Sequence, residues 1–236
     1  KHNLTNTHCS LLCFMATMQP PHKAYDPVVD SYAADGEEDP AFRSRIRNIL
    51  CELTPGNQIL EVGCGPGLDA VALSKQGMKV TAIDLSSGFI DYAKKTHPQV
   101  DFRCMDMRAP TFEDASFDGL LGIACFCHLS SQEVAAALKR YHRLLRPGGV
   151  IVLQMMDSQK VDSYVVEDWC GLDGNRIEMV CHDRNWMADS IESAGFHDIE
   201  IGSIRSAYYE AIPRIQENGI NLYVATALAS DDAQRQ

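Results

Sequence analysis

Residues 61–67 of this chain read Glu61-Val62-Gly63-Cys64-Gly65-Pro66-Gly67, and this stretch decides the fold. It follows a short apolar run at residues 58–60 and precedes a helical pattern that begins at Leu68. A strand, a glycine-rich turn and a helix in this order hold a nucleotide-like ligand in α/β proteins. Glycines let the backbone approach the ligand closely and allow a positive φ in the turn. We therefore expect a ligand-binding turn here.

The spacing of the glycines indicates the kind of ligand. A dinucleotide site has the spacing G-x-G-x-x-G, in which the third glycine packs the helix beside a pyrophosphate. Here the spacing is G-x-G-x-G, and Leu68 occupies the position of that third glycine. Glu61, at the end of the strand, would repel a phosphate and attract an ammonium group. The pattern favours an adenosine-bearing, cationic ligand and makes a nucleotide-dependent oxidoreductase the weaker alternative.

Five stretches in order resemble the class I S-adenosylmethionine-dependent methyltransferases. Residues 61–67 look like motif I of that family, and the others are residues 79–84, 100–107, 116–123 and 144–152. The resemblance extends over residues 30–228. It implies a Rossmann-like, doubly wound α/β fold with a mostly parallel seven-stranded sheet and a C-terminal antiparallel hairpin. It also implies S-adenosylmethionine as cofactor, S-adenosylhomocysteine as product, and a small-molecule acceptor.

The resemblance assigns nucleoside-binding roles to residues that follow the second and third strands. Asp84 would accept hydrogen bonds from both ribose hydroxyls, which suits its two oxygens. Leu85 would form an apolar floor under the adenine. Asp106 would bind the adenine amino group, and the backbone of Met107 would bind a ring nitrogen. The structural alternatives are a helix cap for Asp84 and a surface turn for Asp106.

The methionine part of the cofactor would lie against the turn and the fourth strand. The resemblance places Glu61 in direct or indirect contact with the amino group, and the backbone near Ile123 beside the same part. Tyr32 would fold its ring over the sulfonium, a favourable cation–π contact, or would simply pack. The turn would contribute its own residues, which are Gly63, Cys64, Gly65 and Gly67.

His128 is the candidate catalytic residue. It ends the sequence Ile-Ala-Cys-Phe-Cys-His at the carboxyl end of the fourth strand, where open α/β sheets bind their ligands. Its ordinary pKa near neutrality suits a general base, although a wall residue is an equal alternative. A base is needed only if the nucleophile must lose a proton. We expect no metal, because this short Cys/His tract lacks a second ligand group at fixed spacing.

The acceptor pocket is expected in the C-terminal half. Residues 157–185 would form an acceptor-side insertion. Tyr208 and Tyr209 are expected on a strand, so that only one of them would face the pocket. Candidate lining residues in this half are Tyr164, Trp169, Trp186, Tyr208, Tyr209 and Arg214.

Composition excludes several classes of protein. The 236 residues, 45% of them hydrophobic, suffice for one well-buried domain and are too few for two. The net charge of −11, with no run of Lys or Arg longer than two, disfavours nucleic acid. No stretch is long and apolar enough for a membrane span, and only Lys1 precedes the apolar residues 10–18, so we expect no signal peptide. The nine cysteines lack a framework spacing, which favours a reduced, cytoplasmic compartment.

These observations define one predicted domain. Residues 1–18 would form a disordered or expression-derived arm, and residues 19–236 a single methyltransferase domain in which residues 19–54 form an N-terminal lid and helix. The chain would act as a monomer or a homodimer on a small molecule, without nucleic acid or membrane, and would transfer the methyl group to an O, N or S atom. The alternatives are a non-catalytic protein that binds S-adenosylmethionine or S-adenosylhomocysteine, and a protein-side-chain methyltransferase.

Overall fold

The computed structural model describes residues 19–34 and 39–230. The arm predicted at residues 1–18 lies outside the described residues. No helix in the described part of the chain is long and apolar enough to cross a membrane. The seven cysteines among the described residues are all free thiols.

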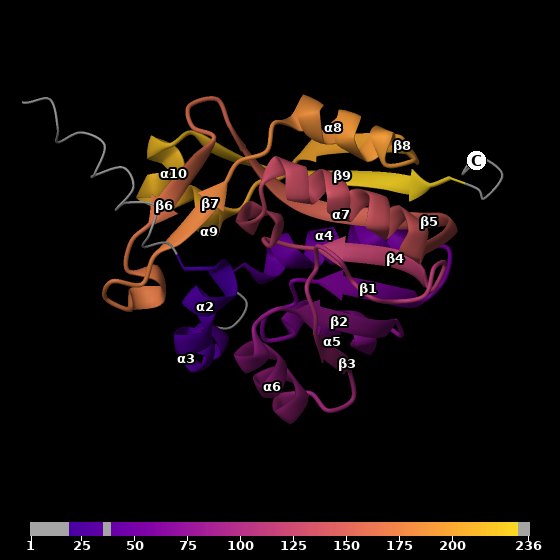
Figure 1. Ribbon diagram of the computed structural model, residues 1–236, viewed down its shortest axis with the longest axis horizontal. Helices are drawn as coiled ribbons and strands as arrows, with labels where there is room; N and C mark the ends of the chain where they lie inside the picture. Colours follow the sequence, from indigo (N-terminus) through magenta and orange to yellow (C-terminus); the bar gives the residue numbers. More distant parts are fainter. Residues whose placement is uncertain (1–18, 35–38, 231–236) are drawn as a thin grey trace, which may run out of the picture.

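A seven-stranded sheet forms the centre of the fold (Figure 1). Its order is β3-β2-β1-β4-β5-β9-β8. The first five strands of this order are parallel, and β9 is antiparallel to both of its neighbours, so the predicted fold class is confirmed. In chain order, the bounds are β1 Gln58–Val62, β2 Lys79–Asp84, β3 Asp101–Cys104, β4 Phe117–Gly122, β5 Leu145–Ser158, β8 Phe196–Ser203 and β9 Ile220–Ala229.

Helices cover both faces of this sheet because its central strands are apolar on both faces. Ile59 of β1 belongs to a buried cluster with side chains of α4 and α5, whereas its neighbour Leu60 belongs to one with side chains of α7 and α8, and both are fully buried. Alternate residues of a strand point to opposite faces, so a central strand covered on both faces is apolar at most positions, and in β1 the buried Glu61 is the exception. The helix bounds are α4 Pro40–Leu53, α5 Leu68–Lys75, α6 Ser87–Thr96, α7 Ser131–Leu144 and α8 Arg184–Ser193.

Two helix starts follow directly from their sequence signals. The Asp39 side chain accepts a hydrogen bond from the backbone N–H of Phe42 at 2.9 Å, and Pro40 opens α4. At α7, the Ser130 hydroxyl caps the N–H of Glu133 while the Glu133 carboxylate accepts from the N–H of Ser130, which completes a capping box. Both helices therefore begin where the residue types of their first turns indicate.

Segments far apart in the sequence gather at one end of the sheet (Figure 1). The N-terminal helices α2, η1 and α3 lie there beside a separate two-stranded sheet of β6 and β7. The Nδ2 atom of Asn175 joins the two parts by donating to the Ala24 carbonyl at 2.8 Å. The bounds are α2 Pro21–Tyr25, η1 Asp26–Val28, α3 Val29–Ala34, β6 Ser163–Val166, η3 Trp169–Gly171 and β7 Ile177–Val180.

The segment after β8 differs from the prediction. The sequence places Tyr208 and Tyr209 on a strand, but β8 ends at Ser203 and both residues lie in the helix α9, Ala207–Glu210. The Ser206 hydroxyl caps this helix by accepting from the N–H of Tyr209 at 3.3 Å, and it donates to Asp39 at 2.6 Å. A second short helix, α10 Pro213–Glu217, leads into β9.

Candidate functional site

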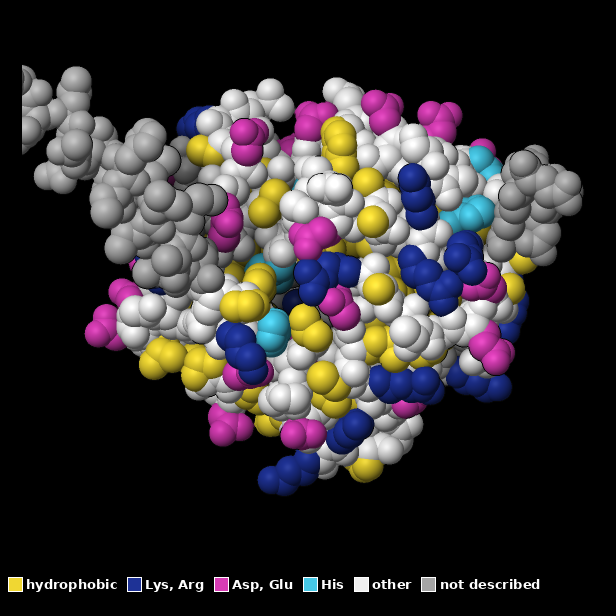
Figure 2. Space-filling view, in the orientation of Figure 1, with side chains coloured by type: hydrophobic (Ala, Val, Ile, Leu, Met, Phe, Trp, Pro, Cys, Tyr) yellow, Lys and Arg dark blue, Asp and Glu magenta, His cyan; other side chains and the backbone are white. Residues whose placement is uncertain are grey.

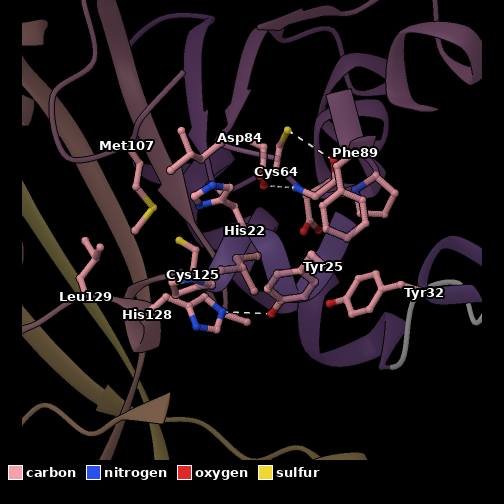
Figure 3. A pocket seen from close by; sticks show the side chains of 18 of the residues that line it. His22, Tyr25, Tyr32, Cys64, Asp84, Phe89, Met107, Cys125, His128 and Leu129 are labelled. Atoms are coloured by element: carbon pink, nitrogen blue, oxygen red, sulfur yellow. Dashed lines mark hydrogen bonds between the residues drawn. The ribbon is translucent and has the colours of Figure 1, made fainter. Parts of the chain in front are cut away.

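A cavity of about 190 Å³ lies at the carboxyl ends of the parallel strands (Figure 3). Open α/β sheets bind their ligands at this edge. The cavity brings together most of the residues that the sequence assigned to the cofactor. Those in its lining are Tyr32, Gly63, Cys64, Gly65, Asp84, Leu85, Asp106, Met107 and Ile123.

Asp84 is held in place at the end of β2 by two backbone N–H groups. Its Oδ2 accepts from Gly65 at 2.9 Å, and its Oδ1 accepts from Ser86 at 2.8 Å. Burial raises the pKa of Asp84, and the two hydrogen bonds counteract part of that shift. Each carboxylate oxygen retains capacity for a further hydrogen bond. The geometry is therefore compatible with the predicted contact to two ribose hydroxyls.

The three glycines of the turn have different roles. A Cβ at Gly63 would lie 2.4 Å from the Cβ of Cys125, and a Cβ at Gly67 would lie 2.6 Å from the ring of Phe102. A Cβ at Gly65 would meet nothing within 4 Å, because this residue opens onto the cavity. Gly67 is absent from the lining, so the structure gives it a packing role rather than the predicted ligand contact. The open space at Gly65 would let a cofactor come close to the backbone of the turn.

Glu61 lies behind the cavity rather than in its lining. It is 3% exposed, and its Oε2 atom has no hydrogen-bond partner among the described residues. Burial raises the pKa of Glu61 well above its ordinary value, and the nearby Asp69 acts in the same direction. Asp69 in turn accepts hydrogen bonds from Arg43 and Arg47. Arg43 and Asp69 line the cavity, and the sequence analysis missed both.

Asp106 and Met107 lie in the lining, but their polar groups are already engaged. The Asp106 carboxylate pairs with Arg108 at 2.6 Å, and this hydrogen bond is the largest cause of its lowered pKa. The carbonyl of Met107 accepts from the hydroxyl of Tyr141 at 2.7 Å. The predicted adenine contact of Asp106 therefore requires the carboxylate to share its oxygens with Arg108.

Tyr25 lies against the cavity and packs against a cluster of aromatic rings. Four ring centroids lie 5.5–5.7 Å from its own: those of Tyr32 (5.6 Å), Phe89 (5.5 Å), His128 (5.6 Å) and Trp169 (5.7 Å). Its hydroxyl lies 3.0 Å from Nε2 of His128 (Figure 3). Burial raises the pKa of Tyr25 and lowers that of His128 to about 4, so both side chains are neutral at pH 7.

Tyr25 is not among the site residues that the sequence predicts. Residues 19–34 lack the repeated apolar spacing that marks an amphipathic helix, so only an isolated short helix was expected there. Pro21 at the first position of α2 and Pro27 in the first turn of η1 are helix-start signals that would have identified both turns.

A second cavity, of about 310 Å³, adjoins the first and shares Tyr25, Tyr32 and Ala124 with it. Five of the six residues expected in the acceptor pocket line this cavity: Tyr164, Trp169, Tyr208, Tyr209 and Arg214. Because Tyr208 and Tyr209 lie on α9, both face the cavity, which corrects the expectation that only one would. Trp186 lies elsewhere and stacks on His182 at a centroid distance of 5.5 Å.

Comparisons with known proteins agree with this geometry. Residues 59–149 match the family described as methyltransferase domain. A malonyl-[acyl-carrier protein] O-methyltransferase of Serratia marcescens is 31% identical over 52% of this chain and 47% of its own length. An S-adenosyl-L-methionine-dependent Diels-Alderase of Neonectria is 28% identical over 63% of this chain and 62% of its own. The chain thus spans about half the length of the curated relatives it matches.

A solved structure shows the same fold. The 1,6-didemethyltoxoflavin-N1-methyltransferase of Burkholderia thailandensis, solved with S-adenosylhomocysteine, has a TM-score of 0.61 and 21% identity over 91% of this chain and 92% of its own. Residues 59–149 therefore match a methyltransferase domain, and the fold agrees with the predicted resemblance to the class I S-adenosylmethionine-dependent methyltransferases. S-adenosylmethionine is the cofactor of this class, and the open space at Gly65 beside the Asp84 carboxylate fits it.

Proposed function

We propose that this chain transfers a methyl group from S-adenosylmethionine to an O, N or S nucleophile of a small-molecule metabolite. The observation that carries the proposal is the junction of the two cavities, which share Tyr25, Tyr32 and Ala124. A cofactor in the first cavity and an acceptor in the second would meet at this junction. The cofactor, when bound, supplies a methyl group on a positively charged sulfur.

The chain's own contribution is placement in a dry site. Methyl transfer needs the nucleophile held in line and close to the methyl group, and fixing that geometry removes much of the entropic barrier. The rings of Tyr25, Tyr32 and Phe89 pack against one another at the cofactor cavity and exclude water there. On the acceptor side, Met156 and Leu222 contribute apolar walls. We propose that Tyr32, which lines this cavity, makes the predicted contact with the sulfonium.

His128 is our candidate for proton removal, acting through Tyr25. A proton that leaves the acceptor can pass to the Tyr25 oxygen while Tyr25 gives its own proton to Nε2 of His128, at 3.0 Å. A histidine whose pKa is about 4 is a weak base. His128 therefore suits a nucleophile whose acidity rises as the methyl group is transferred. An acceptor that is already ionised would not need a base.

The proposal also covers the domain organisation, compartment and partners of the chain. We propose that residues 19–236 act as one domain, in the cytoplasm, as a monomer or a homodimer, and on neither nucleic acid nor membranes. The net charge of −11 supports this view. Figure 2 shows basic side chains interspersed with acidic ones on the face it presents, in keeping with ion pairs such as Arg140–Asp114 and Arg146–Asp118.

A second candidate function is cycloaddition in the same cavity, without methyl transfer. The observation that favours it is the match to a protein named as an S-adenosyl-L-methionine-dependent Diels-Alderase. A cavity of about 310 Å³ that is lined by aromatic rings and adjoins the cofactor cavity would accommodate such a reaction as well as methyl transfer.

One experiment tests these candidates together. The purified chain is incubated with S-adenosylmethionine labelled with deuterium in its methyl group and with a metabolite extract, and the products are read by mass spectrometry. A product that carries the labelled methyl group, absent with Asp84→Ala, supports the proposal. A product of unchanged mass whose formation needs the cofactor supports cycloaddition. Cofactor binding without any product would contradict both and favour a non-catalytic binding protein.

A further inference from the structure

The second cavity has a charge pattern that methyl transfer alone does not explain. Its lining is mostly aromatic and apolar, and Arg214 and Asp168 are the charged residues among the described lining residues. Asp168 is engaged with the protein, since its Oδ1 accepts from the N–H of Gly174 at 2.8 Å. Arg214 extends from α10 at the exposed rim of the cavity.

Arg214 has no protein partner for its charge in the described part of the chain. No hydrogen bond or ion pair of its guanidinium is present there, and only its backbone carbonyl is used, by Asn218. The two arginines that line the first cavity are both paired, Arg43 with Asp69 and Arg108 with Asp106. An arginine whose guanidinium has no partner among the described residues, in the lining of an aromatic cavity, is available for a ligand.

The charge of Arg214 acts inside the cavity rather than only at its rim. Burial raises the pKa of Tyr164, another lining residue, and the positive charge of Arg214 opposes that shift. Both residues line the same cavity, which agrees with this electrostatic influence.

A second group in the cavity wall also lacks a partner. The Nε1 atom of Trp169 is buried without a hydrogen bond to any described residue. Gln154, in the same lining, has both ends of its amide satisfied, by the N–H of Ala124 at 2.9 Å and the carbonyl of Met155 at 2.8 Å. Indole and guanidinium are hydrogen-bond donors that cannot accept. The unsatisfied groups of this cavity therefore call for an acceptor of hydrogen bonds.

The apolar part of the lining indicates the chemistry of the rest of the ligand. Rings of Tyr164, Trp169 and Tyr209 stand with the flexible thioethers of Met156 and Met179 around the cavity. Such walls bind flat, polarisable molecules by stacking and by contacts between sulfur and rings. A volume of about 310 Å³ is at the lower end of the range for small-molecule sites, so the ligand is compact.

We propose that the acceptor is a compact organic acid, with a flat apolar body in the second cavity and a single carboxylate held by Arg214. This inference rests on the proposed function of that cavity as the acceptor site. A carboxylate is favoured over a phosphate because one guanidinium matches one negative charge in a bidentate pair, whereas a phosphate dianion would need a second cation.

The test measures binding of matched probes to the protein loaded with S-adenosylhomocysteine. A panel of flat acids such as indole-3-acetate and 4-hydroxycinnamate is titrated calorimetrically, each beside its neutral primary amide and beside phenyl phosphate. The proteins are the wild type, Arg214→Gln, and the matched control Arg205→Gln. Arg205 is exposed, pairs with Glu210 and lies outside both linings. Its replacement by Gln removes one positive charge, as Arg214→Gln does, without changing either cavity.

The inference predicts that at least one acid binds about 10-fold more tightly than its amide, the lower end of what a hydrogen bond to a charged group contributes. Arg214→Gln should remove this preference and leave S-adenosylhomocysteine binding unchanged, while Arg205→Gln keeps both. Equal binding of acids and amides, a preference that survives in Arg214→Gln, stronger binding of phenyl phosphate, or binding of no acid would overturn the inference.

The cofactor titration separates this inference from the function beneath it. If S-adenosylhomocysteine binds and no acid is preferred, the inference fails and methyl transfer stands. If S-adenosylhomocysteine itself does not bind the wild type, the proposed function fails and the inference falls with it.

Discussion

The hydroxyl of Tyr25 and the Nε2 atom of His128 lie 3.0 Å apart, and this hydrogen bond joins the N-terminal helix α2 to the segment that follows β4. Tyr25 lines both cavities, and His128 lines the first. The contact therefore links the closure of the cofactor cavity to the only acid–base pair that we propose for the reaction. The Tyr25 ring closes the cavity and the Tyr25 hydroxyl belongs to the acid–base pair, so mutation can separate these two roles.

Tyr25→Phe keeps the ring and removes the hydroxyl. If Tyr25 passes a proton to His128, kcat should fall roughly 100-fold, a usual share for general acid–base catalysis. S-adenosylhomocysteine affinity should stay within about 3-fold, since the ring contacts remain. The control is Tyr223→Phe, which also removes a buried hydroxyl hydrogen bond, to the His182 carbonyl at 3.0 Å, but lies outside both linings. An equal loss of kcat in both variants would reduce Tyr25 to a packing residue.

The pH dependence of the rate should report the lowered pKa of His128. Only the neutral imidazole accepts a proton, and burial lowers its pKa to about 4, so kcat/KM should remain high at pH 5.5 and fall only near pH 4. In His128→Gln this acidic limb should disappear and the remaining rate should be low throughout. A limb centred near the ordinary histidine value of about 6.5 would contradict the account.

The same shift predicts how stability depends on pH. The unfolded chain binds a proton at His128 below about pH 6.5, whereas the folded chain binds it only near pH 4. The unfolded state therefore holds more protons in this window, and the free energy of unfolding should fall as the pH drops through it. Urea unfolding at pH 7 and pH 4.5 should show a smaller decrease for His128→Gln than for the wild type. Equal decreases would mean that His128 titrates normally in the folded protein.

Two alanine substitutions in the glycine-rich turn should have opposite consequences. Gly63→Ala places a Cβ 2.4 Å from the Cβ of Cys125, so we expect a loss of roughly 2–4 kcal/mol in the free energy of unfolding, from overpacking and the left-handed backbone. Gly65→Ala should lower the free energy of unfolding by only about 1–2 kcal/mol, the cost of the left-handed backbone, because its Cβ would meet no atom within 4 Å. Its methyl group enters the cavity, and S-adenosylhomocysteine should bind at least about 10-fold more weakly.

Thermal unfolding and calorimetry together check this pair. Gly65→Ala should remain folded and lose affinity, whereas Gly63→Ala should lose stability first. Normal cofactor affinity in folded Gly65→Ala would show that the ligand does not approach the turn as we describe.

Asp84→Ala should weaken S-adenosylhomocysteine binding by about 10- to 100-fold, because it removes hydrogen bonds to a charged group. Asp84→Asn, which keeps the shape, should lose less. Asp101→Asn is the matched control, since Asp101 is an exposed carboxylate at the start of β3 that pairs with Arg103 outside the cavity. Unchanged affinity in Asp84→Ala by calorimetry would refute the ribose assignment.

The elements around the sheet could be predicted from the sequence because each has a local cause. Residues 79–84 and 87–96 form the strand and helix that their apolar patterns predict, with Ser86 as the helix cap. Asp84 and Leu85, to which the resemblance assigns nucleoside contacts at the end of this strand, both line the cavity. Local patterns of this kind need no knowledge of distant contacts.

The lid and the acceptor side depend on contacts between distant segments, which no local pattern contains. Tyr25 owes its position to rings on α6, η2 (Phe126–His128) and η3, up to 144 residues away at Trp169. Tyr208 and Tyr209 have strand-forming side chains, but the Ser206 cap and its bond to Asp39 favour a helix. Glu61 fits motif I by sequence, yet its burial behind the turn emerges only from the packing of α4 and α5 around it.

The central claim is that the cavity at the ends of β1, β2 and β4 binds S-adenosylmethionine. Isothermal titration of the wild type with S-adenosylhomocysteine and, separately, with NAD tests it most directly. We predict one S-adenosylhomocysteine site per chain, weakened in Asp84→Ala, and no binding of NAD. Binding of NAD without binding of S-adenosylhomocysteine would contradict the account.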